Sequence, residues 1–135
     1  MITEDYCSYE VAKLLKEKGF EGDINAYYHI WDYGNKVCSV QEFSRSEAPH
    51  LYIPAPTHQM AMKWLRETHD IIVVVEPHMY DYINSKTSSY VFCLWYGDNY
   101  EEPYSNQHSN IRGMTYNSYE EAVEAALKYC LENLI

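Results

Sequence analysis

The sequence predicts a single α+β domain over residues 1–135, with its elements in the order α-β-β-α-β-β-α. Three segments place apolar residues at helical spacing behind a capping residue, and two pairs of apolar segments are separated by turn residues. In addition, Ile71–Val75 is an unbroken run of β-branched residues. We therefore expect a four-stranded, mainly antiparallel sheet with the helices packed on one face. A mixed sheet, in which Ile71–Val75 lies parallel to a neighbour, is the alternative.

The first third of the chain predicts a helix followed by a hairpin. Ser8 suits an N-cap and Gly19 suits the left-handed end of a helix. The apolar stripe between them comprises Val11, Ala12, Leu14 and Leu15, with Cys7 one turn earlier. Ala26–Tyr33 alternates as a strand does, Gly34-Asn35 is a two-residue turn signal, and Lys36–Phe43 is the expected returning strand.

The middle of the chain predicts a helix that leads into the most apolar strand. Pro54 and Pro56 keep their neighbours extended, and Thr57 can cap the helix that follows. One face of this helix carries Met60, Ala61, Trp64 and Leu65. Because Ile71–Val75 shows no alternation, we expect a central strand that is covered on both faces and that loses regular pairing at Pro77.

The last third predicts a strand, a long irregular stretch and a helix. Tyr90–Tyr96 alternates, whereas Gly97–Asn117 has neither helical nor strand periodicity. Ser118 and Glu121 form a capping box at the start of the final helix. The residues at core spacing in that helix are Ala122, Val123, Ala126, Leu127, Cys130, Leu131 and Leu134.

The composition narrows the class of protein. Apolar residues make up 47% of the chain, too many for a disordered protein, yet no apolar run is long enough to span a membrane. The net charge is −10, which disfavours binding to nucleic acids or anionic membranes. An acidic surface suits a basic protein surface as partner; the alternative is that the charge only keeps the protein soluble. The acidic N-terminus does not resemble a secretory signal, so we expect a cytoplasmic protein with reduced cysteines.

Local sequence patterns for catalysis or metal binding are absent. The chain has no Cys-x-x-Cys or His-Glu-x-x-His spacing, no glycine-rich phosphate loop and no Gly-x-Ser-x-Gly elbow. We therefore expect no enzyme, no metal site and no cofactor. Two alternatives stay open: a metal site assembled from residues far apart in the chain, and Cys38 or Cys93 as a nucleophile beside a histidine, although buried thiols are usually unreactive.

Tyrosine is the unusual feature of the composition, with fifteen residues. Several lie in the Gly97–Asn117 stretch, and tyrosine offers a large contact area with few rotatable bonds and a hydroxyl for hydrogen bonding. This pattern predicts a recognition surface; the alternative is that the tyrosines only pack the stretch onto the sheet. The predicted binding residues are Trp95, Tyr96, Tyr100, Tyr104, His108 and Arg112.

Three segments, Cys7–Phe20, Thr57–Glu67 and Tyr119–Glu132, resemble short uncharacterised proteins from prophages and mobile elements of gut bacteria. All three are predicted helices, and the resemblance does not extend to the strands or to Gly97–Asn117. It implies a phage-related, cytoplasmic setting, and no activity, cofactor or site residue comes with it.

These observations favour a non-enzymatic accessory protein that binds a host or phage protein through its tyrosine-rich stretch. One alternative is a pocket for a nucleotide or another small molecule, walled by Trp31, Trp95 and the loop tyrosines, although the chain is poor in the Arg and Lys that hold phosphates. Another is an acidic DNA mimic whose carboxylates occupy the phosphate site of a DNA-binding enzyme.

Overall fold

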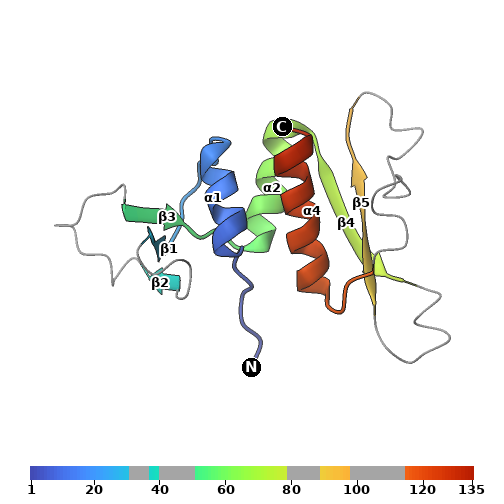
Figure 1. Cartoon of the computed structure of the whole chain (residues 1–135), viewed down its shortest axis with the longest axis horizontal. Helices are drawn as coiled ribbons and strands as arrows, with labels where there is room; N and C mark the ends of the chain where they lie inside the picture. The colour runs from blue at the N-terminus through green and yellow to red at the C-terminus, as the bar shows by residue number, and fades with distance from the viewer. Residues whose placement is uncertain (31–36, 40–50, 79–88, 98–114) are drawn as a thin grey trace.

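The computed structural model describes residues 1–30, 37–39, 51–78, 89–97 and 115–135. In this part of the chain, helices occupy the middle of the molecule and a small antiparallel sheet lies on each side of them (Figure 1). In chain order the elements are α1 (Tyr9–Glu17), β1 (Ala26–His29), β2 (Val37–Ser39), β3 (Tyr52–Pro54), α2 (His58–His69), β4 (Ile72–Pro77), β5 (Tyr90–Trp95) and α4 (Tyr119–Asn133).

The predicted α+β class and the order of the predicted elements are confirmed, but the single four-stranded sheet is wrong. One sheet has the order β2-β1-β3 and the other pairs β4 with β5, all antiparallel. The short strand β3 is an addition that the sequence did not predict. Helix α1 packs against β3, whereas α4 packs against both β4 and β5, so the helices separate the two sheets (Figure 1). The mixed-sheet alternative is wrong as well, because β4 runs antiparallel to β5.

The three predicted helix starts are confirmed by their hydrogen bonds. The hydroxyl of Ser8 accepts from the backbone N–H of Val11 at 3.2 Å, and the hydroxyl of Thr57 accepts from that of Met60 at 3.3 Å. At α4, the Ser118 hydroxyl accepts from the N–H of Glu121 at 3.1 Å. Each cap satisfies a donor that has no partner within its helix, which explains why the helices begin at these positions.

The first helix also ends where the sequence predicts. Gly19 has a φ of +85°, in the left-handed region that glycine enters without a steric penalty. The N–H of Phe20 then donates back to the carbonyl of Leu15 at 2.9 Å. This bond closes the last turn and returns the Phe20 ring to the core, where it packs edge-to-face against Trp64.

The main core lies between the helices and the β4–β5 sheet. Its fully buried side chains include Leu15 of α1, Leu65 of α2, Leu127 of α4, and Phe92 and Leu94 of β5. A second, smaller cluster lies between α1 and the β2-β1-β3 sheet, and comprises Ala12, Ala26, Tyr28, Ile53 and Ala55. Helix α1 thus contributes to both clusters, because it packs against α4 as well as against β3.

The β4–β5 sheet has an inner and an outer face, which its register defines. The pairs Val73–Leu94 and Val75–Phe92 face the main core. The alternate pairs Ile72–Trp95, Val74–Cys93 and Glu76–Val91 form the outer face. Val74 is 37% exposed, so the expectation of a strand covered on both faces is wrong at this position. The Ile71–Val75 run lacks alternation because the outer face of the strand is apolar as well as the inner face, and not because both faces are buried.

In the part of the chain that the structure describes, no helix combines the length and the apolarity that crossing a bilayer requires.

Candidate functional site

Two of the six predicted binding residues lie in the part of the chain that the structure describes. Trp95 lies on the outer face of the β4–β5 sheet, paired in register with Ile72. Tyr96, the next residue, packs against the main core on the other side. The remaining predicted binding residues, Tyr100, Tyr104, His108 and Arg112, lie outside the described residues, as does Trp31. The structure therefore places Trp95 and Tyr96 on opposite faces of the sheet.

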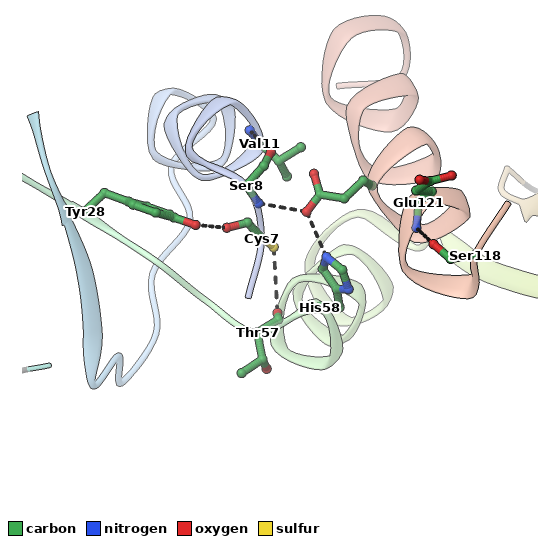
Figure 2. Close-up of polar contacts among 9 residues, drawn as sticks. Cys7, Ser8, Val11, Tyr28, Thr57, His58, Ser118 and Glu121 are labelled. Atoms are coloured by element: carbon green, nitrogen blue, oxygen red, sulfur yellow. Dashed lines mark hydrogen bonds and ion pairs between the residues drawn. The ribbon is translucent and has the colours of Figure 1, made fainter. Parts of the chain in front are cut away.

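A different group of polar side chains meets inside the helical layer: Cys7, His58 and Glu124. One ligand atom from each (the Cys Sγ, a His ring nitrogen and a Glu carboxylate oxygen) lies within 4.8 Å of the others. The Nε2 of His58 lies 2.8 Å from Oε1 of Glu124, and the same oxygen accepts the backbone N–H of Ser8 at 2.8 Å (Figure 2). The Cys7 side chain is fully buried and that of His58 is 8% exposed.

Backbone pairing brings Cys7 and His58 together. The N–H of Cys7 donates to the carbonyl of Pro56 at 2.8 Å, and the N–H of His58 donates to the carbonyl of Asp5 at 2.9 Å. The stretch before α1 therefore runs antiparallel to the stretch that enters α2, with an isolated bridge between Tyr6 and Thr57. These short extended segments precede two capped helices, so both side chains sit at helix starts.

Glu124 comes to the same point from the third helix. It lies in the second turn of α4, three residues before the fully buried Leu127, in the helix that packs against both α1 and α2. Its carboxylate joins three segments of chain, because its Oε1 atom accepts from both Ser8 and His58. Tyr28 extends the group toward the second cluster, since its hydroxyl donates to the carbonyl of Cys7 at 2.6 Å (Figure 2).

The surroundings set the protonation states of two members of the group. Burial by itself would raise the pKa of Glu124, but the hydrogen bonds from His58 and Ser8 outweigh this effect and hold the pKa below its ordinary value. Glu124 is therefore a carboxylate at neutral pH. Burial raises the pKa of the Cys7 thiol, and the negative charge of Glu124 raises it further. The sulfur is therefore a protonated thiol in the structure as it stands.

This arrangement supports ion binding more than nucleophilic catalysis. A cysteine nucleophile needs a lowered pKa and access to substrate, whereas Cys7 has a raised pKa and no exposed surface. Thiol, imidazole and carboxylate together are, in contrast, the donor types that divalent zinc uses in proteins. His58 also lines a cavity of about 240 Å³, whose walls include Glu4, Asp5, Gln59, Tyr119 and Glu120.

Local sequence patterns do not reveal this group, because its members are far apart in the chain. His58 and Glu124 are separated by 66 positions, so no local spacing connects them. The open alternative of a metal site assembled from distant residues fits what the structure brings together. The available signal was indirect: Cys7 and His58 each adjoin a predicted N-cap, Ser8 and Thr57, of helices that share one core.

Comparison of the chain with protein-family models, with curated proteins and with solved structures found no match.

Because burial raises the pKa of its cysteine thiols, the protein is expected to lose stability at alkaline pH. Burial raises the pKa of Cys130 from 9.0 to about 12. Below pH 9.0 the thiol is protonated in both states, so its contribution is fully present. Above this value the unfolded chain loses the proton while the folded one keeps it, and the free energy of unfolding falls by up to about 1.4 kcal/mol per pH unit.

Urea unfolding under reducing conditions at about pH 8 and about pH 10 measures this slope. The Cys130→Ser variant is the control, because a serine does not titrate in this range. We expect its free energy of unfolding to fall less steeply with pH than that of the wild type. Equal slopes in the two proteins would show that Cys130 is not protonated more tightly in the folded state.

Proposed function

We propose that the protein is a non-enzymatic accessory binding protein of phage or mobile-element origin that binds a host or phage protein. The proposed contact surface is the outer face of the β4–β5 sheet, together with the tyrosine-rich Gly97–Asn117 stretch that follows β5, of which residues 98–114 lie outside the described residues. The observation that carries the proposal is the composition of this outer face. It presents Ile72, Val74, Val91, Cys93 and Trp95, five apolar side chains from two adjacent strands.

Partial exposure supports an interaction role for this face within the described residues. Val74 is 37% exposed, and the other four apolar residues are intermediate between buried and exposed. Apolar side chains that are not fully buried and that adjoin one another are typical of interaction sites. A tryptophan among them, Trp95, is the residue type most often found at the energetic centre of a protein interface.

The charge of the chain indicates the kind of partner. The net charge of −10 favours a protein that is basic around an apolar contact area. Glu76 lies on the outer face, next to Val91 in the register, and is exposed. The proposed complex would therefore combine an apolar centre with charge attraction at its edge, so salt should slow its association.

Affinity capture from a lysate of a gut bacterium, with the purified protein as bait, tests the proposal. We expect the wild type to retain one protein reproducibly. The variants Trp95→Ala and Val74→Lys should lose it, as should the double variant Tyr100→Ala/Tyr104→Ala. Removing an aromatic residue at the centre of an interface typically costs about 2 kcal/mol or more, which is about 30-fold in affinity.

The matched control is Ile2→Lys. Ile2 is an aliphatic residue that is fully exposed and lies outside the β4–β5 sheet, so the same charge is added elsewhere. This variant should retain the partner as the wild type does. Repeated capture without any specific partner would contradict the proposal. So would a partner that all three surface variants hold with wild-type affinity, provided that circular dichroism shows the variants to be folded.

A further inference from the structure

The Cys7–His58–Glu124 group carries an inference that is independent of the proposed protein partner. We propose that these three side chains form a binding site for one Zn²⁺ ion, with the fourth coordination position open to water. The site would lie at the junction of α1, α2 and α4. Because no two of its ligands are neighbours in the sequence, it exists only in the folded chain.

The donor atoms fit zinc chemically. Cysteine sulfur, histidine nitrogen and glutamate oxygen bind zinc at about 2.3, 2.0 and 2.1 Å. With tetrahedral angles, two such ligand atoms lie about 3.4 to 3.6 Å from each other. The ligand atoms of the group now lie within 4.8 Å of one another. Side-chain rotations that move each atom by about 1 Å would therefore complete the coordination shell, without a change in the backbone.

The two atoms that hydrogen-bond between His58 and Glu124 are the atoms that would bind the ion. Nε2 of His58 and Oε1 of Glu124 point at each other at 2.8 Å and share a proton. A metal ion that replaces this proton uses the same two lone pairs. The imidazole proton then moves to Nδ1, or leaves if the ring is charged, and the Cys7 thiol releases its proton to solvent as the sulfur becomes a ligand.

The charges of the site also fit a divalent ion. One thiolate, one carboxylate and a neutral imidazole carry a charge of −2, which Zn²⁺ neutralises. Isolated charges in a protein interior are costly, so a buried ligand set that reaches a net charge of zero is favoured. Mg²⁺ and Ca²⁺ would not replace zinc here, because both prefer an all-oxygen shell that Cys7 and His58 do not offer.

Access to the site comes from the cavity that His58 lines. The cavity has a volume of about 240 Å³, enough for several water molecules, and Glu4, Asp5 and Glu120 contribute to its walls. Acidic side chains at this opening would raise the local concentration of cations. Cys7 is fully buried and does not line the cavity, so solvent and metal would reach the ligands past His58.

Titration of the reduced protein with Co²⁺ and then Zn²⁺ tests the proposal. A cobalt ion bound by a thiolate gives a charge-transfer absorption in the near ultraviolet, which adventitious surface binding through histidine or carboxylate does not. We expect this band to saturate at one ion per chain, to disappear on adding Zn²⁺ and to be unaffected by Mg²⁺. Isothermal titration calorimetry with Zn²⁺ should give the same stoichiometry.

Matched variants identify the ligands. Cys7→Ser should abolish the charge-transfer band, and His58→Gln should weaken metal binding by about 100-fold or more. The control is Cys130→Ser, since Cys130 is equally buried but lies outside the group. It should leave both the band and the stoichiometry unchanged. Thermal unfolding checks that each variant is folded. If Cys7→Ser does not fold, the weaker metal binding of His58→Gln tests the proposal instead.

Two results would overturn the proposal. The first is a wild-type protein that shows no thiolate-to-cobalt band at saturating Co²⁺. The second is a band of wild-type intensity in Cys7→Ser, which would assign the thiolate to another cysteine.

Discussion

Replacing Phe92 by alanine is expected to destabilise the protein by about 3 to 5 kcal/mol. Phe92 is 1% exposed, lies on the inner face of the β4–β5 sheet and packs near the ring of Tyr116, at 6.0 Å between ring centroids. Its removal would leave a cavity in the main core that the surrounding helices cannot fill. Domains of this size are typically stable by about 5 to 15 kcal/mol, so the variant should unfold at much lower urea concentration.

The control for this prediction is Val91→Ala. Val91 precedes Phe92 in β5 and points to the outer face, so its truncation should cost about 1 kcal/mol or less. Comparing the two variants by urea unfolding, monitored by circular dichroism, tests which face of the sheet packs on the helices. If Val91→Ala were as damaging as Phe92→Ala, the assignment of inner and outer faces would be incorrect.

Replacing Glu124 by alanine is expected to lower the free energy of unfolding by about 2 to 4 kcal/mol. The change removes the acceptor of both the Ser8 N–H and the His58 ring, while the His58 side chain stays 8% exposed. The Glu124 side chain is itself 26% exposed, so water can replace part of the lost interaction. The loss should therefore remain below that of a fully buried ion pair. Urea unfolding in the presence of a chelator measures it in the metal-free protein.

Two further variants provide reference values for this loss of stability. Glu124→Gln keeps an oxygen acceptor but loses the charge, and it should cost about 1 to 2 kcal/mol. Glu132→Ala removes an exposed carboxylate from the same helix, and it should change stability by no more than about 0.5 kcal/mol. A Glu124→Ala variant as stable as Glu132→Ala would mean that the carboxylate does not hold the three helices together.

The local features of this protein could be predicted from its sequence. The three N-caps at Ser8, Thr57 and Ser118 and the left-handed glycine at Gly19 depend only on residues within one turn of each other. The alternation of Phe92 with its neighbours likewise depends on the period of a strand. These features depend on local interactions and do not require tertiary contacts, which is why the structure confirms them as predicted.

The pairing of strands and the assembly of the polar group were decided by tertiary structure. Apolar periodicity shows which side of a strand faces a core but not which core, so it could not show that the helices lie between two sheets. Cys7 and His58 meet because the segments that enter α1 and α2 pair with each other, and Glu124 joins them because α4 packs against both helices. Their separations in sequence carry no trace of that contact. The sequence by itself thus determined where each helix and most strands lie along the chain. Long-range packing determined which distant side chains became neighbours, because only the burial of shared apolar surface brings such segments together.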